Sequence, residues 1–254
     1  MTRINKYIAE SGYCSRRKAD ELIESGKVKI NGNIINTCGI QVGRNDIVTI
    51  DDIELTKEEH AYYCLYKPSG VITSVSDEKK RKTVIDILPP ECKNKRLFPV
   101  GRLDYDTKGI LLLTNDGEFM NNLVGPKSGI EKEYLARVEG HVKKNEIEIL
   151  QKGIIIDGKK TLPAILSIES VDYKHNSTLV RIIITQGRYH QIKLMFAAIN
   201  HPVKTLKRIR FGCITTVGIK EGEVRPLTIH EIKTLYVLSK EDKILKPSSQ
   251  NNRK

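Results

Sequence analysis

The first 58 residues alternate between amphipathic segments and short apolar runs, which predicts two helices followed by a small sheet. Apolar residues at helical spacing precede Gly12, which ends the first helix. Ser15 can cap a second helix, because its side chain is a good N-cap acceptor. The dipeptide Asn31-Gly32 separates two apolar runs and is typical of a type I′ hairpin turn. Residues 1–58 are therefore predicted to form one compact module.

Strand and helix patterns interleave from residue 61 to residue 239 without a repeated strand–helix–strand unit. Alternation over residues 132–139 predicts a strand with Tyr134 on its apolar face, and an apolar stripe predicts a helix over residues 187–200. The chain is thus predicted to be α+β: the small helical and β module precedes a domain with a largely antiparallel, mixed sheet flanked by helices. Residues 240–254 are polar and are predicted to be a disordered tail.

The sequence GRLDYDTKGILLLTNDG, residues 101–117, places charged side chains directly before an apolar strand. Four of them alternate along the chain: Arg102, Asp104, Asp106 and Lys108. An isolated aspartate in a loop usually is solvated or caps a turn, and Asp106 is interpreted in this way. A carboxylate carried by a loop on a rigid strand can also act as a nucleophile or a base. Asp104 is the candidate for that chemistry.

The charge of the chain favours a polyanionic partner, most simply a nucleic acid. The formal net charge is +12 and the sequence pI is about 9.4. No acidic residue occurs between Asp172 and Glu221, an interval with nine lysines and arginines. A solvated basic face without a partner is the alternative, but a surface of that kind usually mixes signs. Residues 16–18 are also basic, and at a helix N-terminus they oppose the helix dipole unless a phosphate binds there.

Several kinds of site are absent from the sequence. It has no Walker loop, no G-x-G-x-x-G sequence and no zinc-deaminase signature. The five cysteines are scattered, and no pair of them has metal-ligand spacing. No run is long and apolar enough to cross a bilayer, and the N-terminus lacks a signal-peptide core. These observations predict a cytoplasmic protein with no metal and no membrane contact.

The sequence RINKYIAESGYCSRRKADELIESGKVKING, at the start of the chain, resembles the α-L motif, a small RNA-binding module found in a small-subunit ribosomal protein. The resemblance covers about a fifth of the chain, and it implies docking on structured RNA. It does not imply catalysis.

Three further sequences, GRLDYDTKGILLLTNDG, EKEYLARVEG and GRYHQIKLMF, resemble in order and spacing the RsuA/RluB/RluF-type pseudouridine synthases of bacterial ribosomal RNA. With the first module, the resemblance covers nearly the whole chain. It implies isomerisation of a uridine to pseudouridine without a cofactor, in ribosomal RNA or in an assembly intermediate of a ribosomal subunit. Residues 61–239 would be the catalytic domain, and the protein is expected to be a monomer.

The resemblance also implies roles for single residues. Asp104 corresponds to the catalytic aspartate, Tyr134 to the tyrosine near the target base, and Lys193 to the basic residue that pairs with the aspartate. A lysine near the carboxylate would lower its pKa and offset the effect of desolvation. Arg102 would take the place of the flipped base or hold its phosphate. The predicted RNA-binding residues are Arg102, Arg16, Arg17, Lys18, Lys67, Arg188, Arg208 and Arg210.

Each of these residues also has a plainer interpretation. Tyr134 can be core packing, Lys193 can extend its ammonium to solvent beside an apolar stripe, and Lys67 can be a surface cation near a turn. Arg208 and Arg210 are interpreted as alternating on one strand face towards RNA. A non-catalytic RNA-binding or assembly factor and a methyltransferase are the other function classes. The first is expected to lack Asp104 or Lys193, and the second requires a glycine-rich cofactor loop. The sequence leaves the target uridine and the ribosomal subunit open.

Overall fold

The fold comes from a computed structural model, which describes residues 1–125 and 128–241. The chain divides into two compact units. The first contains Met1–Ala61 together with the segment Cys92–Arg96, and the second contains Tyr62–Glu91 and the chain from Leu97 onward. No helix within the described ranges is long and apolar enough to cross a membrane. The α+β class predicted from the sequence is confirmed.

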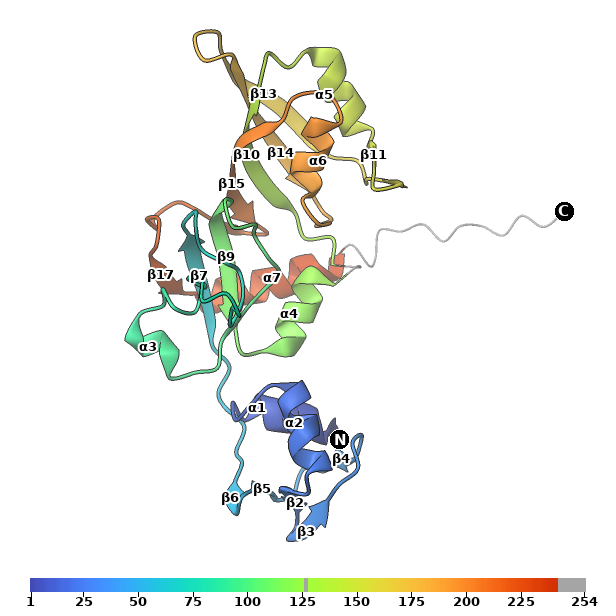
Figure 1. The fold of residues 1–254 in the computed structure, drawn as a ribbon, viewed down its shortest axis with the longest axis vertical. Coiled ribbons are helices and arrows are strands. Elements are labelled where there is room, and N and C mark those ends of the chain that lie inside the picture. The colour runs from blue at the N-terminus through green and yellow to red at the C-terminus, as the bar shows by residue number, and fades with distance from the viewer. Residues whose placement is uncertain (126–127, 242–254) are drawn as a thin grey trace, which may run out of the picture. The chain divides into compact units, whose positions relative to one another are not determined.

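The first unit consists of two helices and short strands (Figure 1). Its elements are β1 (Thr2–Arg3), α1 (Ile4–Glu10), α2 (Arg16–Glu24), β2 (Val28–Ile30), β3 (Asn33–Ile35), β4 (Gln41–Val42), β5 (Val48–Ile50) and β6 (Ile53–Glu54). Ser15 caps α2, because its Oγ accepts a hydrogen bond from the backbone N–H of Lys18 at 3.1 Å. Asn31 and Gly32 have φ values of 51° and 81°, as the predicted type I′ turn requires. The apolar faces of both helices pack on the four-stranded sheet β3-β2-β5-β6.

The second unit is larger and alternates strands with helices. Its elements are β7 (Tyr62–Lys67), β8 (Phe98–Pro99), β9 (Lys108–Thr114), α4 (Gly117–Val124), β10 (Lys132–Glu139), α5 (Lys144–Gln151), β11 (Ile155–Ile156), β12 (Lys159–Lys160), β13 (Ile165–Asp172), β14 (Ser177–Ile184), α6 (Gln191–Ala197), β15 (Val203–Phe211), β16 (Ile214–Thr215), β17 (Val224–Pro226) and α7 (Ile229–Glu241). The short helix α3 (Pro90–Lys93) lies where the chain passes between the two units.

A mixed sheet forms the centre of the second unit, with the strand order β13-β14-β10-β15-β9-β7-β17. Among the described strands, β15 and β9 pair in parallel, and the other pairs of this sheet are antiparallel. The parallel contact is short, with Lys207 opposite Lys108 and Arg208 opposite Gly109. It joins the two halves of the sheet at the point where the loop carrying Asp104 enters β9.

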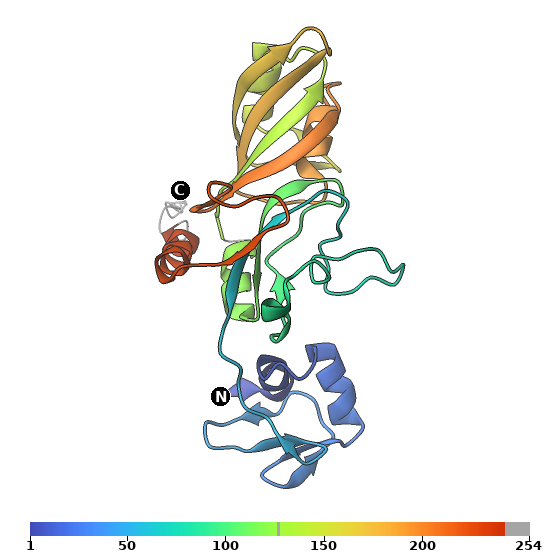
Figure 2. The ribbon, with the colours of Figure 1, turned by 90° about the vertical axis from the view of Figure 1, so that its left-hand side faces the viewer.

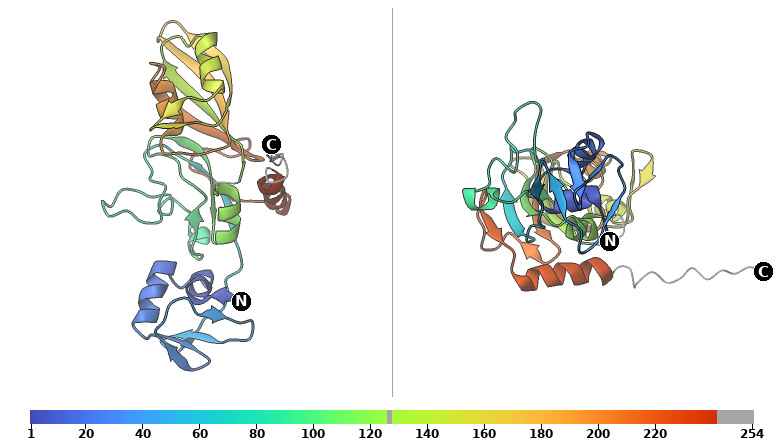
Figure 3. Two further views of the ribbon diagram at one scale, coloured as in Figure 1. Left: turned by 90° about the vertical axis from the view of Figure 1, so that its right-hand side faces the viewer. Right: turned by 90° about the horizontal axis from the view of Figure 1, so that it is seen from below.

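Helices cover different parts of this sheet. Figures 1, 2 and 3 show α5 and α6 on one face of the half formed by β13, β14, β10 and β15. Helices α4 and α7 contact each other and pack against the half that contains β7 and β9 (Figure 3). The core there includes Phe119, Leu123 and Leu235 from the helices, with Ile110 and Leu112 from β9.

Asp116, in the sequence Asn-Asp-Gly after β9, caps α4. It is 5% exposed, and its Oδ1 accepts hydrogen bonds from the backbone N–H groups of Glu118 and Phe119 at the start of α4. Its Oδ2 accepts hydrogen bonds from the hydroxyl groups of Tyr62 at 2.8 Å and Tyr236 at 3.3 Å. Asp116 therefore ties β7 and α7 to the beginning of α4.

The C-terminal part of the chain differs from the sequence-based prediction. Helix α7 runs to Glu241, so Lys240 and Glu241, which were assigned to a disordered tail, are helical. The rest of that predicted tail, residues 242–254, lies outside the described residues. The helix predicted over residues 187–200 begins at Gln191, because His190 before it has a φ of 48°, in the left-handed region, which a right-handed helix does not contain.

Candidate active site

Lys67 builds the loop that carries Asp104. Its side chain is fully buried at the end of β7, and its Nζ donates hydrogen bonds to the carbonyl oxygens of Pro68, Asp104, Tyr105 and Thr107. Burial lowers the pKa of this ammonium to about 8. Lys67 was predicted to bind RNA, or alternatively to be a surface cation near a turn; its complete burial rules out the surface cation and weakens the prediction of an RNA contact. The ammonium instead gathers backbone carbonyls from both sides of the loop.

Asp104 lies beside two basic side chains from the start of α6. Its Oδ2 is 3.1 Å from Lys193 Nζ, and its Oδ1 is 3.5 Å from His190 Nε2. Lys193 also pairs with Asp106 Oδ1 at 2.6 Å. Burial lowers the pKa of Lys193, but the hydrogen bonds to Asp106 and Asp104 outweigh this effect and raise it. The lysine is thus held in its charged form next to the carboxylate.

These groups open into a cavity of about 1270 Å³ in the second unit. Its walls come from the loop before β9, from β10, from the end of β14 and the loop after it, from the first turn of α6, and from β15. The predicted catalytic residues Asp104, Tyr134 and Lys193 all line it, together with Arg102, Arg188 and Arg208. The fold therefore brings together residues that are up to 106 positions apart in the sequence, from Arg102 to Arg208.

Tyr134 and Lys132 project from β10 on the cavity side of the sheet. Tyr134 is 7% exposed and therefore offers a buried aromatic wall. Lys132 is also 7% exposed, and its Nζ donates hydrogen bonds to the carbonyl oxygens of Ile130 and Thr185. Burial, with a smaller effect from Arg208, lowers the pKa of Lys132 to about 8. Lys132 was not predicted as a site residue, although its two-residue spacing from Tyr134 on a strand places it on the same face.

A β-bulge corrects the prediction that Arg208 and Arg210 share one strand face. Tyr134 on β10 lies opposite Arg208 on β15, whereas Glu133 lies opposite Arg210, so Ile209 has no opposite residue. Side chains that lie directly opposite each other in an antiparallel pair share a face. Arg208 therefore lines the cavity with Tyr134, and Arg210 lies on the other face with Glu133.

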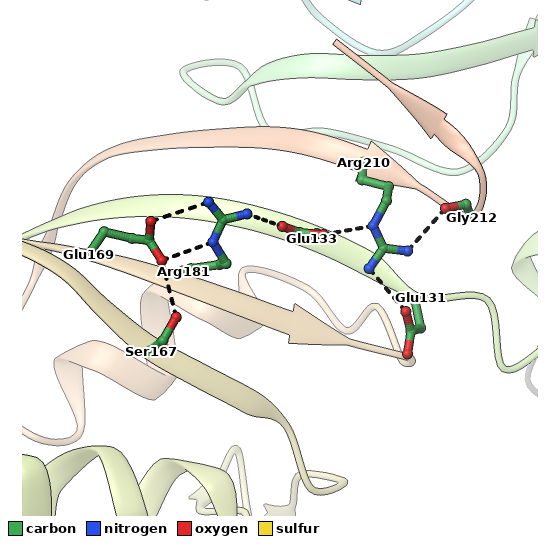
Figure 4. A network of polar contacts seen from close by, with 7 residues as sticks. All are labelled: Glu131, Glu133, Ser167, Glu169, Arg181, Arg210 and Gly212. Atoms are coloured by element: carbon green, nitrogen blue, oxygen red, sulfur yellow. Dashed lines mark hydrogen bonds and ion pairs between the residues drawn. The ribbon is translucent and has the colours of Figure 1, made fainter. Parts of the chain in front are cut away.

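Arg210 belongs to an ion-pair network on that other face, shown in Figure 4. Its Nε donates to Glu133 Oε2 at 2.6 Å, and its Nη2 donates to Glu131 at 3.0 Å. Glu133 also pairs with Arg181, which in turn binds Glu169. The basic interval of the sequence is thus partly paired with carboxylates from outside it. This pairing weakens the prediction that Arg210 binds RNA.

The remaining predicted RNA-binding residues lie either in the first turn of α2 or at the cavity. Arg16, Arg17 and Lys18 are exposed in the first turn of α2, as a docking role requires. Arg102 is exposed at the rim of the cavity. Arg188 is half-buried, and its guanidinium donates hydrogen bonds to the carbonyl oxygens of Ile156 and Lys159 in the hairpin of β11 and β12.

Comparisons with known proteins agree with this geometry. The family model described as RNA pseudouridylate synthase matches residues 61–198, which is more than half of the chain and includes the loop of Asp104, Tyr134 and Lys193. The chain belongs to the RNA pseudouridylate synthase family. The S4 domain model matches residues 2–48 of this synthase, within the first unit.

Relatives of this synthase match along most of their length. It is 43% identical to the ribosomal large subunit pseudouridine synthase B of Bacillus subtilis (strain 168), over 94% of this chain and 97% of the relative. It is 38% identical to the ribosomal small subunit pseudouridine synthase A of Haemophilus influenzae, over 92% of this chain and 99% of the relative. A crystal structure of a pseudouridylate synthase, 34% identical, covers 92% of this chain and superposes with a TM-score of 0.66. The pseudouridine synthase is thus of the RsuA/RluB type.

The donor set of the described residues gives no sign of a metal centre. No group of three or more His, Cys, Asp or Glu side chains in this part of the synthase is arranged to hold a metal ion. The acidic residues of the site, Asp104 and Asp106, are both paired with Lys193.

Proposed function

We propose that this synthase isomerises a uridine of ribosomal RNA to pseudouridine without a cofactor and with Asp104 as the reacting carboxylate. The observation that carries the proposal is the ion pair between Asp104 and Lys193 at the mouth of a cavity whose wall includes Tyr134. The lysine ammonium lies 3.1 Å from the carboxylate and pairs with it. A carboxylate placed in this way can attack the sugar or the ring, or accept a proton.

The cavity supports a mechanism in which the target base leaves its stack. The reacting atoms of a uridine are inaccessible inside a helix, so the base must be extruded, which costs a few kcal/mol. An aromatic wall such as Tyr134 compensates by about 1–3 kcal/mol through stacking. Arg102 is exposed at the rim and supports the proposal that it replaces the base or holds its phosphate.

The first unit is proposed to dock the enzyme on RNA. Its exposed cations Arg16, Arg17 and Lys18 lie at the N-terminus of α2, where backbone N–H groups also attract phosphate. We expect the enzyme to be a monomer. We place it in the cytoplasm, acting on ribosomal RNA or on an assembly intermediate of a subunit.

The test uses unmodified 16S and 23S transcripts from the organism's own genome. Both are needed, because the chain is similar to a synthase named for the large ribosomal subunit and to one named for the small subunit. The wild-type enzyme should form pseudouridine at one position or a few positions. Asp104→Asn should keep the fold and the RNA affinity but should lose turnover by at least about 10³-fold, because the amide is neither a nucleophile nor a base. Asp172→Asn, at the end of β13, is the matched control and should react normally. Turnover by Asp104→Asn above a tenth of the wild-type rate would refute the assignment.

A further inference from the structure

The cavity contains buried polar atoms without a partner. Among the described residues, the buried side-chain nitrogen and oxygen atoms that lack a hydrogen-bond partner are Thr107 Oγ1, Gln186 Nε2 and Arg208 Nη2. All three residues line the same cavity. A buried polar atom without a partner costs about 1–3 kcal/mol, so folded proteins keep few of them. Their concentration at one cavity indicates that a polar ligand completes their hydrogen bonds.

Arg208 is the most firmly fixed of the three. It is 2% exposed, and its Nε donates a hydrogen bond to the carbonyl oxygen of Ile110 at 2.6 Å. Its guanidinium carbon lies 5.1 Å from the centre of the Phe211 ring. These contacts fix the plane of the guanidinium and leave Nη2 without a partner. The parallel pairing with Gly109 fixes the backbone of Arg208 as well.

The charge of Arg208 is also unbalanced. The ion pairs found within the described ranges include none for Arg208, whereas Arg210, two residues later, pairs with Glu131 and Glu133. The cation nearby on the cavity wall, Lys132, adds positive charge and binds only carbonyl oxygens. The inner part of the cavity is therefore preorganised for a ligand that carries, or acquires, negative charge.

A phosphate of the RNA backbone fits this place poorly. Phosphates lie on the outside of a nucleic acid and are bound by exposed cations such as Arg102 and Arg16, whereas Arg208 is buried opposite Tyr134. A flipped pyrimidine can enter such a cavity. Uracil offers two carbonyl oxygens as acceptors, which match donors such as Arg208 Nη2 and Gln186 Nε2.

We propose that Arg208 donates a hydrogen bond to a carbonyl oxygen of the target uracil and stabilises the negative charge that forms on the base during the reaction. This inference rests on the proposed function. When the bond between N1 and C1′ breaks, its electron pair stays on the base, which becomes a uracil anion with charge on N1 and both carbonyl oxygens. C1′ is left one electron pair short, and the reacting carboxylate of Asp104 offsets this until the base has turned. An electron pair of the ring then forms the bond from C5 to C1′. The proton on C5 passes to a base or to water, and N1 takes up one proton, so nothing is consumed overall.

The arrangement also predicts base selectivity. Uracil can accept hydrogen bonds from Arg208 Nη2 and Gln186 Nε2 together, one at each carbonyl oxygen. A cytosine has an amino group in place of one carbonyl oxygen, and an amino group cannot accept a hydrogen bond from the second donor. A mismatched pair of donors in a buried site is costly, because both groups stay unsatisfied. Arg208 is thus expected to favour uridine in the reacting state rather than to increase general RNA affinity.

The experiment compares Arg208→Gln with the wild type and with Arg137→Gln. Arg137 is an arginine of β10 that donates a hydrogen bond to Ser177 Oγ, and it is not among the residues of the cavity. Single-turnover rates at saturating 16S and 23S transcripts, RNA affinities and melting temperatures are measured for each protein. Arg208→Gln should slow turnover by about 10²–10³-fold, with RNA affinity within threefold of the wild type. Arg137→Gln should match the wild type.

Three results would overturn the inference. The first is turnover by Arg208→Gln within threefold of an active wild type. The second is weaker RNA binding with a normal saturating rate, which would make Arg208 a phosphate contact. If Arg208→Gln does not fold, Arg208→Lys replaces it, since lysine keeps the charge but has one nitrogen in place of the rigid guanidinium, which binds Ile110 through Nε and leaves Nη2 for the base. The third result that would overturn the inference is turnover by Arg208→Lys within threefold of the wild type. A loss of turnover of at least tenfold in Arg208→Lys supports the inference. An inactive wild type would instead refute the proposed function.

Discussion

Gly109 makes the junction of the two sheet halves possible, and replacing it with alanine should destabilise the second unit. Its φ is +119°, which residues with a Cβ rarely adopt. A Cβ atom at this position would lie 2.0 Å from the carbonyl oxygen of Arg208 and 2.7 Å from its backbone nitrogen. These neighbours are backbone atoms of the paired strand, so the strands themselves must separate.

The cost of Gly109→Ala has two parts. The backbone strain contributes about 1–3 kcal/mol, and the forced displacement of a packed neighbour contributes about 1–3 kcal/mol more. The total of about 2–6 kcal/mol corresponds to a fall in melting temperature of about 4–24 °C for a unit of this size. Because the displaced residue is Arg208, the turnover rate should fall as well, even under conditions where the variant is folded.

Gly218→Ala is the matched control for this experiment. Gly218 also has a positive φ, +75°, but a Cβ there meets no atom within 4 Å. Its cost is the strain alone, about 1–2 kcal/mol. Calorimetric scans of the full chain should therefore show a clearly larger loss for Gly109→Ala. If the two variants melt within 2 °C of each other, by the scale of about 2–4 °C per kcal/mol, the close approach to Arg208 does not constrain the fold.

Two further predictions concern Asp116 and Lys132. Asp116→Ala should lower the free energy of unfolding by about 2–3 kcal/mol, because α4 loses its cap and the Tyr62 hydroxyl loses its acceptor. Urea denaturation measures this free energy, and a loss below about 1 kcal/mol would contradict the prediction. Burial, and then Arg208, lowers the pKa of Lys132 to about 8, so between pH 8 and 10 the unfolded chain binds more protons at this lysine than the folded chain. The free energy of unfolding of the wild type relative to Lys132→Met should therefore rise by about 2 kcal/mol over this range, and a constant or falling difference would refute it.

Local signals in the sequence predicted local structure well. Ser15 was expected to cap α2, and Asn31-Gly32 was expected to form a type I′ turn, because a few adjacent residues determine each of these features. Asp104 and Lys193 are separated by 88 residues, and no local pattern connects them. Their pairing was therefore expected only from the resemblance to a family. It is present in the structure.

Features that depend on tertiary contacts were missed. Lys67 reads as a surface cation beside a turn, and only the folded loop supplies the four carbonyl oxygens that hold it in the interior. The acid-free interval from Asp172 to Glu221 reads as one basic surface, but β10 brings Glu133 against it from outside. The segment Cys92–Arg96 belongs to the first unit although the chain has already entered the second. A one-dimensional pattern does not contain such contacts.

The bulge at Ile209 is the extra residue of β15, because Ile209 has no opposite residue in β10. Its two neighbours lie opposite Tyr134 and Glu133, which are adjacent in β10 and therefore point to opposite faces of the sheet. Deleting Ile209 would make Arg208 and Arg210 adjacent, and alternation along a regular strand would keep them on these two faces. A β15 that is one residue shorter and has no bulge would therefore keep Arg208 in the cavity and Arg210 beside its glutamates.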